Sequence, residues 1–170
     1  EVLEAGAEPV RTRVGHSFIK GEMARSGAVF GGEHSAHYYF RDFWFADTGM
    51  LAAMHVLAAL GEGTEPLSAI AGHFDRYAAS GEINSTVTDT AAAKDRARTW
   101  AEDTHGPVEV DTLDGLTITK RDEQGEWLWW FNLRASNTEP LLRLNAEARD
   151  QPTMAAIRDH VLAVVRGSLP

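Results

Sequence analysis

The segment from Trp127 to Leu133 limits the possible folds of this chain more than any other part of the sequence. Its large apolar side chains occupy every second position: Trp127, Trp129, Phe131 and Leu133. Neighbouring residues of a β-strand face opposite sides of a sheet, so this period of two predicts a strand with one buried face. Asp114-Gly115 and Gln124-Gly125 are typical turn sequences. These turns predict that the strand at 127–133 pairs antiparallel with the alternating segment 116–120.

The rest of the C-terminal part favours the same arrangement. Apolar patterns predict further strands at 83–87, 108–110 and 141–144. Asp89 is a typical N-cap for a charged helix that extends to about residue 104. Another helix is expected at 67–79, and an amphipathic helix follows Pro152. Together these elements predict an α+β domain with an antiparallel sheet.

Short strands and helices alternate in the N-terminal part. The pattern predicts a helix at 17–25, strands at 28–30 and 38–40, and a second helix that Asp47 caps and Gly61 ends. This order indicates a layered α/β unit, whose sites are expected in loops at the strand ends. Residues 61–66 have the composition of a linker. We therefore expect two domains, 1–62 and 63–170, and the fold class α/β plus α+β.

Composition excludes several classes of function. The 16 Lys and Arg residues against 25 Asp and Glu residues give a formal net charge of −9, which disfavours a nucleic acid or an anionic membrane as partner. The chain has no cysteine, so it has no disulfide framework and no thiolate metal site. This composition suits a cytoplasmic protein. Its apolar stretches are shorter than a membrane span.

The first residue is Glu1 and the first methionine is Met23, so we expect a fragment.

A polar segment follows the strongly apolar strand, from Arg134 to Pro140. It supplies a guanidinium group, two hydroxyls and an amide within five positions: Arg134, Ser136, Asn137 and Thr138. A guanidinium fork matches phosphate oxygens, and hydroxyls and turn N–H groups add neutral donors. The segment is a candidate phosphate clamp. Its composition is equally typical of a surface turn, so the residues alone leave both interpretations open.

A second polar segment places Glu33, Ser35 and His37 at alternating positions. In extended backbone these side chains share one face, where a carboxylate and a hydroxyl can bind vicinal sugar hydroxyls and a histidine can carry protons. An ordinary polar loop remains the alternative. A metal site of Glu33, His34 and His37 lacks a third well-spaced ligand, so we expect no metal here.

The third segment is a glycine turn at the start of a helix, Gly15-His16-Ser17-Phe18-Ile19-Lys20. Backbone donors and Lys20 are placed to face an anion there. Helix capping by Ser17 explains the same residues equally well.

The three segments, in this order, resemble the C-terminal half of the α-D-phosphohexomutase family, and within it most closely the bacterial phosphomannomutases (phosphomannomutase/phosphoglucomutase). The resemblance covers essentially the whole chain, including Phe74-Asp75-Arg76-Tyr77 and Ser80-Gly81-Glu82-Ile83-Asn84. It implies a truncated third α/β domain followed by the complete fourth domain, out of four domains around a cleft.

The resemblance also implies roles for individual residues. Glu33, Ser35, His37 and Lys20 would bind the sugar phosphate. His16 and His37 would be catalytic candidates, as phosphate contacts or in proton transfer. Arg134, Ser136, Asn137 and Thr138 would hold the phosphate that is not transferred. No metal ligand is implied within these 170 residues.

The implied reaction of the whole enzyme, an isomerase of carbohydrate metabolism, interconverts mannose 6-phosphate and mannose 1-phosphate, with glucose phosphates as further substrates. A phosphoserine and Mg²⁺ would take part, but the chain has no Ser-His-Asn stretch and no Asp-x-Asp-x-Asp stretch that would supply them. We therefore expect this chain alone to be inactive and to need the missing N-terminal domains. Apolar surface left by the truncation is expected to favour a dimer.

Two departures from the family pattern bear on the alternatives. Ala36 stands where the family usually has glycine, and Asn137 stands where a phosphoglucosamine mutase usually has glycine. The second departure disfavours a phosphoglucosamine mutase fragment. A stand-alone sugar-phosphate-binding module remains the alternative from another class.

Overall fold

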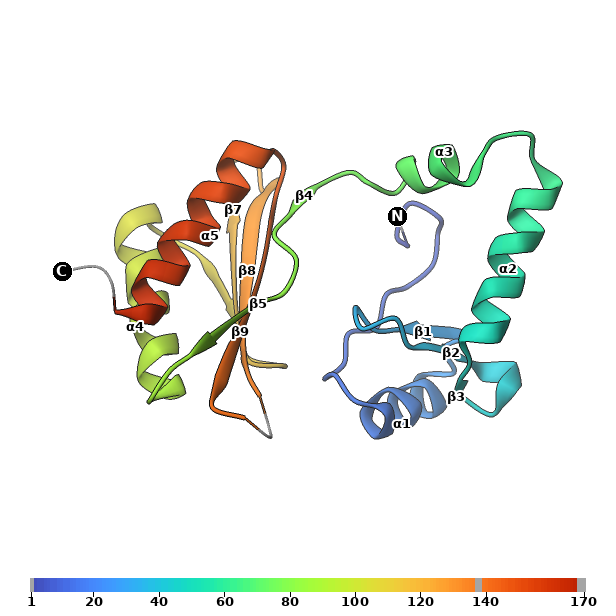
Figure 1. The fold of residues 1–170 in the computed structure, drawn as a ribbon, viewed down its shortest axis with the longest axis horizontal. Helices are drawn as coiled ribbons and strands as arrows, with labels where there is room; N and C mark the ends of the chain where they lie inside the picture. Colours follow the sequence, from blue (N-terminus) through green and yellow to red (C-terminus); the bar gives the residue numbers. More distant parts are fainter. Residues whose placement is uncertain (1, 137–138, 168–170) are drawn as a thin grey trace. The chain divides into compact units, whose positions relative to one another are not determined.

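A computed structural model describes residues 2–136 and 139–167 of the chain (Figure 1). The chain divides into two compact units between Gly72 and His73, and each unit is described by itself. The domain boundary expected after residue 62 from linker composition stays a prediction.

The N-terminal unit contains a small antiparallel sheet in the strand order β1-β2-β3. Its elements are α1 (His16–Ser26), β1 (Phe30–Gly32), β2 (Tyr38–Phe40), the 3₁₀ helix η1 (Arg41–Phe43), β3 (Ala46–Asp47), α2 (Gly49–Glu62) and α3 (Leu67–Gly72). Ile19 and Met23 of α1 pack against Tyr39 of β2 in a small buried cluster. This packing fixes the first turn of α1 beside the loop that joins β1 and β2.

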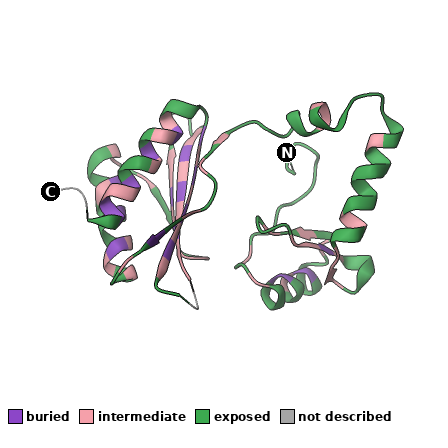
Figure 2. Ribbon diagram, in the orientation of Figure 1, coloured by how far each residue is buried: buried purple, intermediate pink, exposed green. Residues whose placement is uncertain are grey.

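The N-cap of α2 differs from the expectation. Thr48 caps this helix, and its Oγ1 accepts a hydrogen bond of 3.3 Å from the N–H of Leu51. The carboxylate of Asp47 cannot serve as the cap, because it is bound to His37 and Tyr38 instead. The helix itself is as predicted in position, but none of its residues is buried (Figure 2).

The C-terminal unit is built on a six-stranded sheet in the order β4-β9-β8-β7-β6, with β5 also pairing with β9. All of its pairings are antiparallel. Its elements are β4 (Ala78–Ala79), β5 (Ile83–Thr86), α4 (Thr90–His105), β6 (Glu109–Asp111), β7 (Leu116–Arg121), β8 (Trp127–Ala135), β9 (Leu141–Ala148) and α5 (Gln151–Arg166). The predicted fold class, α/β plus α+β with an antiparallel sheet in the second domain, is confirmed.

The core of the C-terminal unit lies between the sheet and the helices α4 and α5 (Figures 1 and 2). Trp129, Phe131 and Leu133 of β8 are buried, as the period of two predicts. On α4 and α5 the buried side chains recur at spacings of three, four and seven: Ala93, Ala97, Ala101, Met154, Ile157, Val161 and Val164. Alternate residues of β8 face the other side of the sheet, so Arg134 lies on the face opposite to this core.

The helix expected at 67–79 is wrong in its second half. Only Leu67–Gly72 is helical, and Ala78 and Ala79 form β4. These two residues pair with Ala148 and Glu147 of β9, so sheet pairing overrides their helical propensity.

Within the described residues, no helix is long and apolar enough to cross a membrane.

Candidate functional site

The carboxylate of Glu33 is held through both of its oxygens. Glu33 directly follows β1, and its Oε1 accepts a hydrogen bond of 2.9 Å from the N–H of Gly15, the residue before α1. Its Oε2 accepts a hydrogen bond of 2.7 Å from the hydroxyl of Tyr39. Both partners fix the side chain in place, which reduces the entropy that Glu33 would lose on binding a ligand.

His37 is oriented by a carboxylate from the next strand. Its Nδ1 lies 2.7 Å from Oδ2 of Asp47, and Oδ1 of Asp47 accepts a hydrogen bond of 2.9 Å from the N–H of Tyr38. Hydrogen bonds from the His37 ring and the Tyr38 N–H hold the pKa of the Asp47 carboxyl below its usual range. Asp47 is therefore ionised near neutral pH and accepts the Nδ1 proton of His37.

His16 completes the cluster from the first turn of α1. Its ring lies edge-on to the ring of His37, with 4.7 Å between the centroids and 67° between the planes. Its Nδ1 is 3.0 Å from the hydroxyl oxygen of Tyr39. Burial and the Glu33 carboxylate raise the pKa of the Tyr39 hydroxyl, so Tyr39 remains protonated. One tyrosine thus links Glu33 to His16.

The backbone between Glu33 and His37 forms a turn, not the extended conformation in which Glu33, Ser35 and His37 would share one face. The N–H of Ala36 donates to the carbonyl of Glu33 at 3.0 Å, which closes a turn, and the N–H of Glu33 donates to the carbonyl of His37 at 2.9 Å. Ala36 has a φ of 64°. Glu33 and His37 therefore face each other across a hairpin, and Ser35 lies exposed in the turn between them.

The structure therefore brings together some of the predicted residues. His16, Glu33 and His37 each offer a ligand atom, and these atoms lie within 4.8 Å of one another. Lys20 is exposed one helical turn after His16, on the same side of α1. With two imidazoles, this donor set does not suit Mg²⁺, which prefers oxygen ligands, and no other such cluster occurs among the described residues.

The candidate phosphate clamp lies where β8 ends. Arg134 pairs with Arg143 of β9 one residue before the end of β8, and the N–H of Ser136 donates to the carbonyl of Leu141 at 2.8 Å. Asn137 and Thr138 lie outside the described residues, so their predicted role stays a prediction. Ser136 directly follows the last residue of β8, two positions after Arg134.

Arg134 lies among other charged groups. Its Nη2 is 3.8 Å from Oε2 of Glu82, and its Nε is 3.9 Å from Oδ2 of Asp114. Arg143, its cross-strand neighbour on β9, is 3.5 Å from Oε1 of the same Glu82. These distances exceed that of a close charge-assisted hydrogen bond, so the two guanidinium groups can exchange these partners for a ligand anion.

Tyr39, Asp47 and Arg143 were not expected from the sequence to be functional. Tyr39 was expected only as part of an aromatic strand, and Asp47 only as a helix cap. Arg143 offered one signal: it occupies a polar position in the alternating pattern of the strand that follows Arg134. Their partners are distant in the sequence, so spacing alone does not reveal them.

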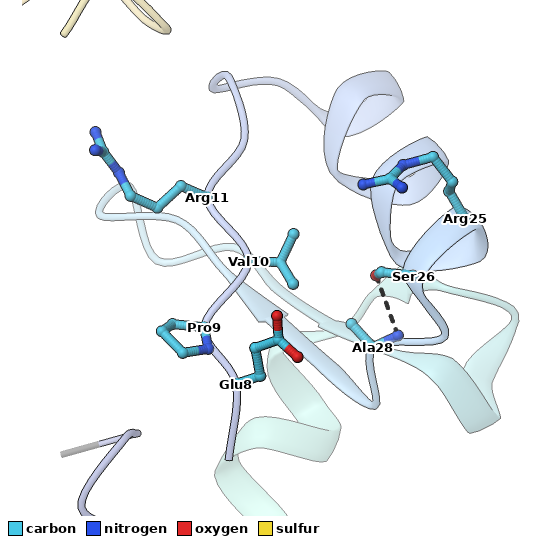
Figure 3. Close-up of a pocket in the computed structure, with 7 residues that line it drawn as sticks. All are labelled: Glu8, Pro9, Val10, Arg11, Arg25, Ser26 and Ala28. Carbon is cyan, nitrogen blue, oxygen red and sulfur yellow. Dashed lines mark hydrogen bonds between the residues drawn. The ribbon is translucent and has the colours of Figure 1, made fainter.

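A shallow pocket of about 480 Å³ lies elsewhere in the N-terminal unit (Figure 3). It is lined by Glu8, Pro9, Val10, Arg11, Arg25, Ser26 and Ala28. The guanidinium group of Arg25 is paired with Glu22, and the N–H of Ala28 donates to Oγ of Ser26 at 3.3 Å. None of the predicted site residues lines this pocket, so we do not place the site there.

Comparison with protein families gives two matches in tandem. The family described as phosphoglucomutase/phosphomannomutase, alpha/beta/alpha domain III, matches residues 2–77. The family described as phosphoglucomutase/phosphomannomutase, C-terminal domain, matches residues 82–164. Both candidate segments of the N-terminal unit fall within the first match, and Arg134 falls within the second.

Curated relatives show the same similarity. A protein named phosphomannomutase from Escherichia coli is 41% identical over 167 residues, which are 97% of this chain and 35% of the relative. A protein of the same name from Methanocaldococcus jannaschii is 39% identical over 155 residues, covering 91% of this chain and 32% of the relative. The chain thus spans about a third of the length of the curated relatives it matches.

A solved structure agrees with the sequence comparisons. A phosphoglucomutase/phosphomannomutase family protein from Burkholderia thailandensis superposes with a TM-score of 0.75 at 27% identity, over 99% of this chain and 35% of that protein. Family matches, relatives and fold all agree, and we conclude that the chain belongs to the phosphoglucomutase/phosphomannomutase family.

Proposed function

We propose that this chain provides the sugar-binding and phosphate-binding parts of a phosphomannomutase, an isomerase that interconverts mannose 6-phosphate and mannose 1-phosphate and accepts the corresponding glucose phosphates. The observation that carries this proposal is the convergence of Glu33, His16 and His37 on one point, in a chain of this family. A carboxylate and two imidazoles at one point are suited to a polyhydroxylated, anionic substrate.

Glu33 and Ser35 would bind the sugar hydroxyls. The carboxylate of Glu33 has lone pairs left after its bonds to Gly15 and Tyr39, and an ionised carboxylate is a strong acceptor for hydroxyl protons. Ser35 is exposed in the turn and can donate or accept. The rigid support of Glu33 favours one orientation of the sugar ring.

His37 is the stronger of the two candidates for proton transfer. Oδ2 of Asp47 lies 2.7 Å from Nδ1 of His37 and accepts its proton, which leaves Nε2 as the atom that can accept a proton. The Asp47 carboxylate also stabilises the imidazolium that forms. His16, bound to Tyr39, would contact a phosphate or carry the proton when the sugar binds in the opposite orientation.

Arg134, Ser136, Asn137 and Thr138 would hold the phosphate that is not transferred. The guanidinium group of Arg134 provides a two-pronged donor, and the loop adds neutral donors. Arg143, on the neighbouring strand, would add a second guanidinium group. Both arginines lie near the carboxylate of Glu82, which holds them on the same side of the sheet. Lys20 would assist as a point charge beside the sugar loop, since it lies exposed one turn after His16.

The reaction itself needs groups beyond these 170 residues. A sugar hydroxyl oxygen attacks the phosphorus of a phosphoserine; the new sugar O–P bond forms as the serine O–P bond breaks, and a proton passes from the sugar hydroxyl to a base and onto the serine oxygen. The reverse step removes the other phosphate of the bisphosphate. Mg²⁺ would stabilise charge in the whole enzyme, but the described residues do not fit it, so no step is assigned to it here.

Calorimetric titration with mannose 1-phosphate and glucose 1-phosphate tests the binding role. We expect saturable binding to this chain that Arg134→Ala weakens at least about tenfold, because a charge-assisted bidentate contact is lost. Arg98→Ala is the matched control, since Arg98 is an exposed arginine of the same unit on α4. Equal binding by the wild-type chain, Arg134→Ala and Arg98→Ala would contradict the proposal.

We also propose that the exposed apolar side of α2 supports self-association of this chain. Met50, Met54 and Leu57 recur at helical spacing and are 75%, 57% and 60% exposed. A second copy that covers this stripe would remove apolar surface from water. Sedimentation velocity would show a dimer that Leu57→Glu dissociates, whereas a monomer at millimolar concentration would contradict this.

A cytoplasmic location stays a prediction from the cysteine-free composition.

A further inference from the structure

We propose that His16, Glu33 and His37 form a binding site for a divalent transition-metal ion of the Zn²⁺ class. The three ligand atoms already lie within 4.8 Å of one another. The sequence did not indicate this set, because His16 is 17 positions before Glu33 and only the packing of α1 on β2 brings them together. This histidine supplies the third ligand that the spacing of Glu33, His34 and His37 lacks.

The hydrogen bond to Asp47 determines which nitrogen of His37 is free. An ionised carboxylate only accepts hydrogen bonds, so Nδ1 of His37 must carry the proton in its 2.7 Å contact with Asp47. In the neutral ring, Nε2 then carries the lone pair. A carboxylate that holds the far side of a histidine is the usual support of a metal-ligating imidazole.

The proton on the His16 ring is likewise located by its hydrogen-bond partner. The single hydroxyl proton of Tyr39 is donated to the Glu33 carboxylate at 2.7 Å. The oxygen of that hydroxyl can therefore only accept from Nδ1 of His16, which lies 3.0 Å away. Nδ1 carries the proton, and Nε2 of His16 is left with its lone pair. Each histidine therefore keeps one ring nitrogen with a lone pair for a metal ion, and rotation of the exposed His16 ring can aim its Nε2 at the cluster.

Two imidazole nitrogens and one carboxylate oxygen form a typical ligand set for Zn²⁺ with an open fourth position. Ligands at about 2.1 Å from a tetrahedral metal lie about 3.4 Å apart, so the cluster has to contract slightly. His16 is exposed and can rotate its ring for this purpose. Zn²⁺, Co²⁺ and Ni²⁺ are accordingly favoured over Mg²⁺, which prefers an octahedron of oxygens.

A metal ion at this position would share Glu33 and His37 with the sugar of the proposed function. Zn²⁺ and hexose phosphate would then exclude each other, and only this consequence rests on the proposed function. The binding experiment below contains no sugar phosphate. Its failure would leave the proposed function untouched, and a failure of sugar binding would leave the metal site untouched.

Calorimetric titration of the full chain with Zn²⁺ alone tests the site. We expect one high-affinity zinc ion per chain, and an affinity at least about tenfold lower in His37→Ala and in Glu33→Gln, since each variant removes one ligand. His16→Gln gives the same loss without risk to folding, because the His16 side chain is exposed. Circular dichroism verifies that every variant is folded.

His34→Ala is the matched control. His34 is an exposed histidine between two of the ligands in the sequence, but it is outside the cluster. The site predicts that His34→Ala binds Zn²⁺ as tightly as the wild-type chain and that a large excess of Mg²⁺ does not displace the zinc. A loss in His34→Ala as large as that in His16→Gln would overturn the proposal, as would zinc affinity that no ligand variant changes.

Discussion

In the turn from Glu33 to His37, Ala36 is the residue whose backbone conformation fits its side chain least well. Its φ of 64° lies in the left-handed region, which disfavours a residue with a Cβ by about 1–2 kcal/mol. The sequence indicated a departure from the usual glycine here but not the turn that makes it costly. The strain is tolerated because the hydrogen bonds of Glu33 and His37 define the turn on both sides.

Replacing Ala36 by glycine should therefore stabilise the N-terminal unit. We expect a gain of about 0.5–1 kcal/mol, because relief of the left-handed strain exceeds the entropy that glycine adds to the unfolded chain. Urea unfolding followed through the amide resonances of β1 and β2 measures the change. As a control, Ala53→Gly in the exposed middle of α2 should destabilise by about 1 kcal/mol. A loss of stability in Ala36→Gly would show that the turn differs from this structure.

His105 gives the C-terminal unit a dependence on pH. Its ring lies edge-on to Trp100 and Trp129, and burial, with help from Lys120 and His160, lowers its pKa below the usual value. The unfolded chain therefore binds more protons than the folded chain as pH falls below about 6.5. Stability present above that pH is lost as the solution becomes more acidic.

Thermal unfolding at pH 7.5 and pH 5.5 measures this effect. We expect the wild-type unit to lose stability between these values and His105→Phe to lose less, because phenylalanine keeps the aromatic contacts but does not titrate. An identical decrease in His105→Phe would assign the pH dependence to other groups.

At the scale of elements, the strands and turns of the C-terminal unit followed from the sequence more closely than any other part. The period of two in β8, the Asp89 cap of α4 and the two glycine turns are local signals, and all are confirmed. The predicted cap of α2 and the second half of the helix at 67–79 are wrong because tertiary contacts decided them. Asp47 binds His37, and Ala78 pairs with Ala148.

The two turn glycines allow a matched test of local packing. Gly115 and Gly125 have similar φ values of 86° and 82°. A Cβ on Gly115 would lie 2.5 Å from the carbonyl oxygen of Leu133, whereas a Cβ on Gly125 would meet nothing within 4 Å. The turn before β7 is therefore packed against β8, and the turn before β8 is open.

Gly125→Ala should destabilise the chain by about 1–2 kcal/mol, from backbone strain alone. Gly115→Ala should cost about 1–3 kcal/mol more, because the backbone of β8 must move to admit the methyl group. Urea denaturation followed by tryptophan fluorescence compares the two. Equal losses would mean that the Asp114-Gly115 turn does not pack on β8 as described.

Across the whole molecule, the sequence suggests which segments form the candidate site, and this stays a prediction, but it does not show how their side chains are held. Glu33, His37 and Arg134 are recognisable from residue type and from their position at strand ends. Tyr39 and Asp47 could not be recognised, because a tyrosine in a strand and an aspartate before a helix have ordinary structural explanations. Their roles depend on side chains that come together only through the pairing of β1, β2 and β3.

The chain by itself should show no mutase turnover. It has no Ser-His-Asn stretch and no Asp-x-Asp-x-Asp stretch, so we expect it to bind a hexose phosphate without transferring a phosphoryl group. A coupled assay with mannose 1-phosphate and catalytic bisphosphate checks this expectation. Turnover by the purified chain that Glu33→Gln abolishes would overturn it.

Titration of the ¹⁵N-labelled chain with mannose 1-phosphate shows whether the two loops bind a sugar phosphate. We expect saturable shifts of the amide resonances around Glu33 and His37 and around Arg134 and Ser136, and loss of the first set in Glu33→Gln. His34→Ala should retain both sets. Shifts confined to the pocket around Arg11 and Arg25, or no shifts up to millimolar ligand, would contradict the assignment of sugar and phosphate binding to these two loops.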